Sequence, residues 1–394
     1  MQIGVYHIVA DNYNQESIND DGRNYLTKLG KSSGITFKKV TLNTASEMDA
    51  NFIFVKSGGT EGLFKKAYEK LEGPYYLLTT GEYNSLAAAL EIATFLKNNN
   101  EVCEILHGDI EEVANRVKFL STVASAKKQL KGTKFGVIGE PSDWLIASSI
   151  DEEKLMNKYG VELVSIPMDE FLMEVVTNFS SNDKILRELM GKFSDKEVAK
   201  VFKVYGALKA LIKKYKLNGL TIRCFDLVEK SSTTTCLALA LLNKEGYTSS
   251  CEGDIASLLS MHIIRCLLDQ SSFQANPSHM TNAELTLAHC TVPFDMCSKY
   301  TFMTHFETNQ GIAIKGTLPE GDVTIFKLSA DLQSYVAYET TLIENLDEKN
   351  LCRTQIKIKI DESFKKYLLT SPCGNHHIVV KGHHKELIDA FLKL

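Results

Sequence analysis

The sequence predicts an α/β protein in which two tandem parallel-sheet domains are followed by a smaller antiparallel β-rich domain. Short apolar runs alternate with amphipathic segments of helix length as far as about Asn276, which is the pattern of βαβ units. Glycine-containing turns follow several of these runs, as they do where parallel-sheet proteins bind ligands. Beyond Asn276 the runs become short, alternating and interrupted by Gly, Pro or Asp, which is typical of antiparallel sheets and barrels.

The first domain is expected to cover residues 1–130. Apolar runs at 3–10, 51–56, 75–80 and 101–107 are strand candidates, and amphipathic segments at 62–71, 86–98 and 110–130 are helix candidates. Strands separated by helices of this length predict a parallel sheet.

The second domain is expected to cover residues 131–280. Its strand candidates are 135–139, 161–167, 220–225 and 248–251. Pro141 and Ser142 follow the first of these strands and predict the start of a helix. Further helices are expected at 183–216, at 233–245 and at 255–268, and the last of these is apolar on nearly every face, which predicts burial.

The third domain is expected to cover residues 281–394. Its strand candidates are 283–292, 300–308, 311–316, 323–328 and 354–360, and a short amphipathic helix is expected at 385–394.

Composition narrows the class of protein. The 394 residues are 44% hydrophobic and 24% charged with a formal net charge of −5, which argues against disorder, a general nucleic-acid binder or a protein of anionic membranes. No apolar stretch approaches the roughly 20 residues of a membrane span. The first residues do not have the pattern of a signal peptide, and the nine cysteines include no Cys-x-x-Cys pair. We therefore expect a cytoplasmic protein with reduced cysteines.

Two carboxylates follow neighbouring strands of the second domain. Asp226 and Glu252 are 26 positions apart, yet both come directly after a strand candidate, so they are expected at the same edge of the sheet. Two carboxylates brought together need a proton or a cation between them, and Mn²⁺ and Mg²⁺ prefer such oxygen ligands. The alternative is that each residue caps the helix that follows it.

A histidine pair near the end of the chain is the second feature. His376 and His377 enter an apolar run, and adjacent residues of a strand point to opposite faces, so only one of them can face a site. His383 and His384 lie in a polar setting and are expected in solvent.

These segments resemble a known metal site. The sequences Arg-Cys-Phe-Asp, Cys-Glu-Gly-Asp and Gly-Asn-His-His-Ile-Val resemble the metal-binding segments of the L-fucose and L-arabinose isomerase superfamily. The resemblance implies that Asp226, Glu252 and His377 bind the metal, with Asp254 and Glu229 as alternatives. It implies Mn²⁺, or another divalent cation such as Mg²⁺ or Co²⁺. It also implies a homo-oligomer, a trimer or a hexamer.

The resemblance implies aldose–ketose isomerisation of a sugar through an enediol, with Asp226 and Glu252 as the catalytic acid and base. Several residues are candidates for sugar binding; for the histidines a structural role is the alternative, and for Trp144 ordinary packing. They are Trp144, Asn276, His289, His305 and Arg353.

Two other functions remain open at this point. A sugar-binding protein or regulator of the same fold would need no metal carboxylates. An epimerase or lyase would begin with the same proton abstraction as an isomerase.

Overall fold

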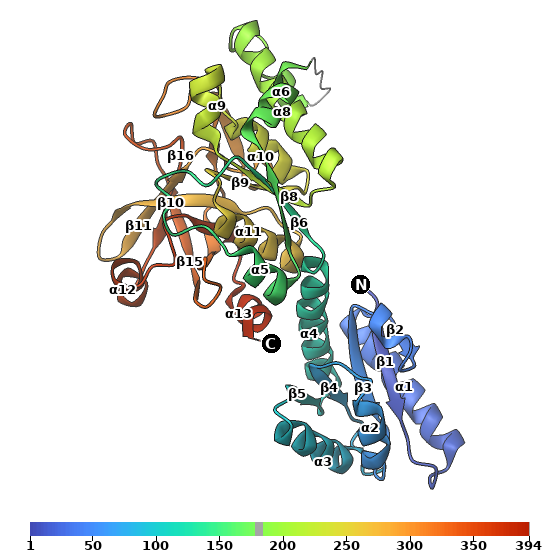
Figure 1. Cartoon of the computed structure of the whole chain (residues 1–394). Coiled ribbons are helices and arrows are strands. Elements are labelled where there is room, and N and C mark those ends of the chain that lie inside the picture. Colours follow the sequence, from blue (N-terminus) through green and yellow to red (C-terminus); the bar gives the residue numbers. More distant parts are fainter. Residues whose placement is uncertain (178–183, 394) are drawn as a thin grey trace. The chain divides into compact units, whose positions relative to one another are not determined.

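The computed structural model describes residues 1–177 and 184–393, and the expected helix residues Asp183 and Leu394 lie outside them. The chain divides into two compact units, Met1–Lys128 with Ala390–Leu394, and Gln129–Asp389 (Figure 1). In the described part of the chain, no helix is both long enough and apolar enough to cross a membrane.

The first unit is built on a five-stranded parallel sheet in the order β2-β1-β3-β4-β5. The strands are β1 (Ile3–Ile8), β2 (Phe37–Val40), β3 (Ala50–Val55), β4 (Tyr75–Leu78) and β5 (Cys103–Leu106). The helices are α1 (Gln15–Ser33), η1 (Ala45–Glu47), α2 (Glu61–Tyr68), α3 (Ser85–Asn98) and α4 (Ile110–Leu130). Alternate strand residues feed two hydrophobic clusters, one with Phe52 and Phe54 and one with Ile53 and Val55, so the sheet buries both faces.

The second unit contains a four-stranded parallel sheet in the order β7-β6-β8-β9. The strands are β6 (Lys134–Ile138), β7 (Glu162–Ile166), β8 (Gly219–Ile222) and β9 (Thr248–Cys251). The helices are α5 (Glu152–Tyr159), α6 (Met168–Val176), α7 (Lys184–Arg187), α8 (Asp195–Tyr215), α9 (Cys224–Ser231), α10 (Cys236–Lys244) and α11 (Ile255–Leu268).

The same unit contains a closed antiparallel barrel in the order β10-β11-β16-β15-β14-β17. Its strands are β10 (Phe273–Met280), β11 (Glu284–His289), β14 (Gly321–Leu328), β15 (Tyr335–Asn345), β16 (Thr354–Lys359) and β17 (His377–Lys381). The remaining elements are η2 (Phe294–Met296), the paired strands β12 (Lys299–Met303) and β13 (Ala313–Thr317), and α12 (Glu362–Thr370). Helix α13 (Lys385–Lys393) begins in this unit, and its residues from Ala390 on are assigned to the first. The predicted fold class, parallel α/β sheets followed by antiparallel β-structure, is confirmed.

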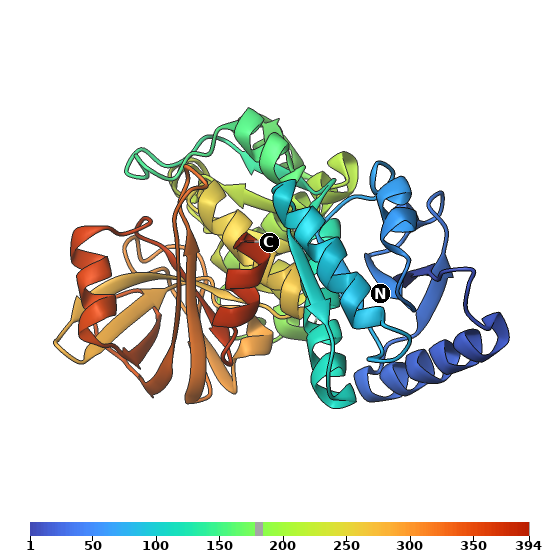
Figure 2. The same ribbon diagram turned by 90° about the horizontal axis from the view of Figure 1, so that it is seen from below.

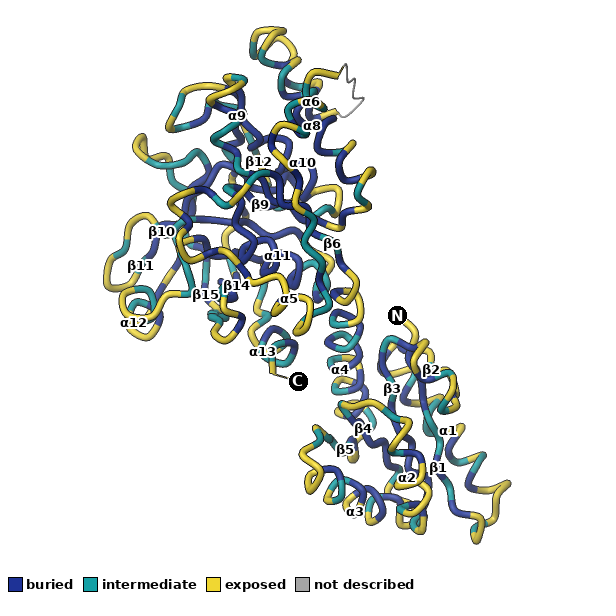
Figure 3. Tube along the Cα trace, in the orientation of Figure 1, coloured by how far each residue is buried: buried dark blue, intermediate teal, exposed yellow. Residues whose placement is uncertain are grey.

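Helix α11 joins the sheet to the barrel within the second unit. It contacts β8 and β9 on the sheet and β10, β14 and β17 on the barrel (Figure 2). Its buried residues occupy every face, as Figure 3 shows, because it has protein on both sides. One hydrophobic cluster includes Ile222 of the sheet and Phe273, Leu287 and Val379 of the barrel. The boundary expected at residue 280 therefore lies inside a shared core.

The helix predicted from Pro141 is wrong. Residues 141–149 form turns, and α5 begins only at Glu152. The Pro141 carbonyl accepts a hydrogen bond from Arg223 Nη1 at 2.8 Å, and the Ser142 amide donates to the Glu252 carbonyl at 2.9 Å. These backbone groups bind the loops after β8 and β9, so they are not used within a helix.

Candidate active site

The carboxyl ends of β8 and β9 lie side by side. The two strands are parallel neighbours, and Ile222 is paired with Cys251 at their ends. Arg223 and Glu252, which follow these residues, therefore begin at the same edge of the sheet.

Asp226 does not join Glu252 at this edge. Helix α9 begins directly after Arg223, and Asp226 lies in its first turn, where the helix dipole favours a negative charge. Asp226 Oδ1 accepts a hydrogen bond from Arg223 Nε at 2.9 Å, and Arg223 also forms two hydrogen bonds with the carboxylate of Asp143, at 3.1 and 2.7 Å. The expected pairing of Asp226 with Glu252 is replaced by this local ion-pair group. Glu229, the alternative in α9, is exposed to solvent.

Glu252 is held in an uncommon backbone conformation. Its φ is 66°, in the left-handed region, and that of Gly253 is 73°. A Cβ atom at Gly253 would lie 2.7 Å from Pro141 Cα, so the close approach of the 141 loop requires glycine here. Strained non-glycine residues of this kind are common at functional sites.

Glu252 converges with two histidines from the barrel. Its Oε1 lies 3.7 Å from His289 Nε2 and 3.7 Å from His376 Nε2, and the ligand atoms of all three residues lie within 4.8 Å of one another. His289 is the last residue of β11, and His376 directly precedes β17. The barrel strand β10 pairs with both β11 and β17, which brings these two strand ends together.

His376 occupies the position that the sequence analysis assigned to His377. The His377 ring lies on the other side of the strand, where its Nδ1 donates to the Asn375 carbonyl at 3.0 Å and its Nε2 accepts from Tyr367 Oη at 3.0 Å. Both of its ring nitrogens are thus occupied. The alternation of side chains along a strand excludes one of two adjacent histidines, and the register selects His376 for the site.

Asp254 lies next to this cluster and forms a hydrogen bond with His376. It is fully buried and is the N-cap of α11, with Oδ1 accepting from the Ser257 amide at 2.8 Å. Its Oδ2 accepts from His376 Nδ1 at 2.8 Å and lies 3.3 Å from Nζ of the buried Lys327 in β14. Asp254, an alternative metal ligand in the sequence analysis, therefore orients a histidine and caps a helix, while Glu252 does not cap.

The charges of these groups depend on one another. Burial raises the pKa of Glu252, but His289 and His376 outweigh it and leave that pKa below its ordinary value. For Asp254, burial is likewise outweighed, by Lys327 and His376, so its pKa is also lowered. Burial lowers the pKa of His376, and the two carboxylates more than compensate, so the pKa is raised. The cluster thus favours positive charge next to Glu252.

Glu252 and His289 of this cluster line a small cavity of about 40 Å³. Three of the predicted sugar-binding residues, Asn276, His289 and His305, line it, and so does Glu307, which the sequence analysis did not single out. Burial and the charge of Glu252 raise the pKa of Glu307. In the sequence, Glu307 lies two positions after His305, but neither its spacing nor its neighbours distinguish it from the other carboxylates of the chain.

Trp144 and Arg353 lie beside this cavity. Trp144 Nε1 donates to Glu252 Oε2 at 2.6 Å, and its ring meets Phe225 edge to face with the centroids 5.0 Å apart. Arg353 follows the cavity residue Cys352 and donates through Nε to the Thr304 carbonyl at 2.8 Å. Within residues 1–177 and 184–393, no carboxylate forms an ion pair with Arg353.

Glu252, His289 and His376 fit a divalent metal ion. Among the described residues, His376 Nε2 is buried and has no hydrogen-bond partner. The Asp254 carboxylate accepts a hydrogen bond from Nδ1–H, so the proton stays on Nδ1 and Nε2 is left to act as a ligand. Outer-shell carboxylates hold metal-binding histidines in the same way at many sites. A carboxylate with two imidazoles suits Mn²⁺, Co²⁺ or Zn²⁺ better than Mg²⁺ or Ca²⁺, which prefer oxygen ligands alone.

The chain is similar to known sugar isomerases. It is 25% identical over 268 residues to the sulfoquinovose isomerases of Priestia aryabhattai and Priestia megaterium, which covers 64% of this chain and 60% of each relative. The sulfoquinovose isomerase of a Clostridium species is 26% identical over 192 residues, 46% of this chain and 42% of that protein. The match therefore spans less than two thirds of the length of these relatives. No protein-family model matches the chain.

Proposed function

We propose that this protein is a metal-dependent aldose–ketose isomerase that acts through an enediol. The observation that carries the proposal is the convergence of Glu252, His289 and His376, whose Nε2 has no hydrogen-bond partner in the described part of the chain. Glu252 and His289 also line one cavity. The similarity to sulfoquinovose isomerases supports it.

Glu252, His289 and His376 would hold the ion, for which we propose Mn²⁺, with Co²⁺ as a substitute. Mg²⁺, which the sequence analysis also named, prefers oxygen ligands and fits this set less well. When bound, such an ion would supply Lewis-acid stabilisation of the charge that develops on the sugar oxygens when the C2 proton leaves. Asp226 is no longer part of the proposed ligand set, because its carboxylate pairs with Arg223.

The proton transfer is assigned to the carboxylates of the cavity. Glu307 is the second carboxylate of the lining after Glu252, and its Oε2 lies 3.9 Å from His305 Nε2. In the proposal, Glu307 takes the proton from C2 and returns it to C1, while His305 and Asn276 bind hydroxyl groups. Trp144 holds Glu252 Oε2 by a hydrogen bond.

The proposed substrate is an aldose that carries an anionic group. Arg353 is the basis for this, since a guanidinium without a carboxylate partner can bind an anion through two parallel hydrogen bonds. Sulfoquinovose, the sugar in the name of the relatives, is the first candidate.

A sugar panel tests the proposal. The chelated protein is assayed with added Mn²⁺ on sulfoquinovose and on neutral aldoses, and both ketose formation and deuterium exchange at C2 are followed. We expect Mn²⁺-dependent ketose formation with exchange. Formation of the epimeric aldose would indicate an epimerase, and sugar binding that survives chelation without turnover would indicate a binding protein. Either outcome would contradict the proposal.

We also propose that the active form is a homo-oligomer, a trimer or a hexamer. All residues that line the cavity belong to the second unit. The glycine-containing turns of the first unit, which are of the kind that bind ligands, therefore have no ligand assigned to them within this chain. Light scattering of a dilute, active sample is the measurement. Full activity from a stable monomer would contradict this proposal.

A further inference from the structure

A second cluster of ligand-type side chains lies in the wall of the same cavity. The ligand atoms of Cys236, Cys290 and His305 lie within 4.8 Å of one another, and all three residues are buried. None of them belongs to the set Glu252, His289 and His376.

Three separate elements hold this cluster. Cys236 is the first residue of α10, and the hydroxyl of Thr234 just before it donates to the Ile312 carbonyl at 3.1 Å. Cys290 follows the last residue of β11. The His305 amide donates to the Gln310 carbonyl at 3.1 Å, which closes the loop after β12. The backbone therefore fixes the three side chains before any ligand is present.

The distances suit a single ion. The sulfurs of Cys236 and Cys290 are 3.2 Å apart. Two thiolates at about 2.3 Å from one tetrahedral zinc ion lie roughly 3.8 Å apart, so the two sulfurs would separate by about half an ångström on binding it. His305 Nδ1 lies 3.2 Å from Thr308 Oγ1. The hydroxyl can therefore accept a hydrogen bond from Nδ1–H, which leaves Nε2 as a ligand. Burial lowers the pKa of His305 to about 4, which keeps the ring neutral at ordinary pH.

The chemistry of the donors differs from that of the Glu252 cluster. Thiolate sulfur selects soft or borderline cations, whereas carboxylate oxygen suits harder ones. We propose that Cys236, Cys290 and His305 form a second metal site that binds a soft or borderline cation such as Zn²⁺ or Cd²⁺. Cys352 lines the same cavity. The metal site does not require isomerase activity, and a bound cation would occupy His305 Nε2 in place of the sugar hydroxyl proposed above.

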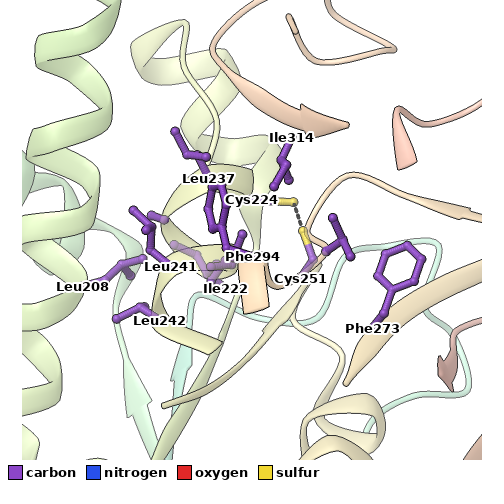
Figure 4. Packing of buried hydrophobic residues seen from close by; sticks show 14 of the residues in the cluster. Leu208, Ile222, Cys224, Leu237, Leu241, Leu242, Cys251, Phe273, Phe294 and Ile314 are labelled. Atoms are coloured by element: carbon purple, nitrogen blue, oxygen red, sulfur yellow. Dashed lines mark hydrogen bonds between the residues drawn. The ribbon is translucent and has the colours of Figure 1, made fainter. Parts of the chain in front are cut away.

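The cavity offers an internal comparison. Cys224 and Cys251 form another close thiol pair, with 3.3 Å between their sulfurs, and both also line the cavity. Figure 4 shows this pair packed among buried apolar side chains. Among the described residues, no histidine or carboxylate completes a three-ligand group with it. Cys224 therefore provides a matched control for Cys236.

The experiment is a titration of the reduced, full-length chain with Cd²⁺, followed by the ultraviolet thiolate-to-cadmium charge-transfer band. We expect saturation at one Cd²⁺ per chain. Cys236→Ser and His305→Gln should each weaken this binding about ten-fold or more, since losing even an outer-shell partner costs a metal site that much. Cys224→Ser and Glu252→Gln should leave the band and the affinity unchanged, and excess Mn²⁺ should not displace the Cd²⁺.

Three results would overturn the proposal. One is the lack of a charge-transfer band in the reduced wild-type chain. Another is wild-type affinity in His305→Gln, which keeps both thiols and so remains informative if Cys236→Ser fails to fold. The third is an equal loss of affinity in Cys224→Ser, which would assign the ion to the other thiol pair.

Discussion

The ends of β8 and β9 are neighbours in the sheet, yet only the segment after β9 contributes a residue, Glu252, to the cluster with His289 and His376. After β8 the chain enters α9 at once, and the first acidic residue, Asp226, pairs with Arg223 at 2.9 Å. After β9 a turn through Glu252 and Gly253 comes before the N-cap Asp254. The inserted turn frees Glu252 to project beyond the strand. A direct passage from strand to helix leaves Asp226 in a local ion pair.

The largest effect is expected from Glu252→Gln. The amide keeps the shape but loses the charge that faces His289 and His376. Turnover should fall about 10²-fold or more, because a metal ion supplies several kcal/mol of charge stabilisation in the transition state. The measurement is the initial rate of ketose formation with Mn²⁺, with the melting temperature as a check on folding. More than a tenth of wild-type activity in the variant would remove Glu252 from the proposed mechanism.

Asp226→Asn is the matched change at the end of β8. The carboxylate is 29% exposed and its partner is Arg223, and ion pairs near the surface contribute about 0–1 kcal/mol. We expect the rate to change less than about two-fold, because no step of the proposed reaction involves this residue. A loss comparable to that in Glu252→Gln would mean that the two strand ends act together, as the sequence suggested.

The buried pair beneath the site gives the next largest effect, on stability. Lys327 and Asp254 are 1% and 0% exposed, and removing one partner of such a pair leaves an uncompensated charge. Lys327→Met should lower the free energy of unfolding by about 3–5 kcal/mol. The exposed Lys359 of β16 is the control, and its replacement by Met should cost less than about 0.5 kcal/mol. Equal losses from the two variants would contradict this account.

The two ends of β9 also face different histidines. His262 of α11 lies at the start of the strand, with Nδ1 2.8 Å from Thr248 Oγ1, and burial lowers its pKa to about 4. Because the unfolded chain binds this proton near pH 6.5 and the folded chain does not, stability is lost as the pH falls from about 6.5 towards 4. The free energy of unfolding lost over this pH range is about 3 kcal/mol.

His262→Asn should remove this part of the acid sensitivity. Unfolding by urea at pH 7 and at pH 5 measures it. The difference in stability between the two pH values should be smaller in the variant than in the wild type. An unchanged difference would mean that other groups account for the whole of the acid effect.

The sequence predicted the fold class better than the site. Periodicity located most strands of the parallel sheets, but it missed α1, which buries few apolar side chains. The helix predicted from Pro141 failed because the loop binds Arg223 and Glu252, and contacts across 80 or more positions leave no local pattern. The sequence predicted that β8 and β9 are neighbours, which is confirmed, and with it the edge where Glu252 lies.

The side chains at that edge depend on finer geometry. Glu252 and His289 were singled out and lie together, although their binding of an ion stays a prediction. Sequence could state that His376 and His377 face opposite ways, but the register of β17 against β10 decides which one faces inward. The role of Asp226 depended on whether a turn separates strand from helix, and a single sequence does not reveal that.

Mn²⁺ binding by His376→Gln and His377→Gln tests the central claim most directly. The chelated, full-length chain is titrated with Mn²⁺, and free ion is measured by electron paramagnetic resonance, with circular dichroism to verify folding. We expect one Mn²⁺ per wild-type chain, an affinity at least about 10–100-fold weaker in His376→Gln, and unchanged affinity in His377→Gln. Undiminished binding in His376→Gln, or its loss in His377→Gln alone, would contradict the account.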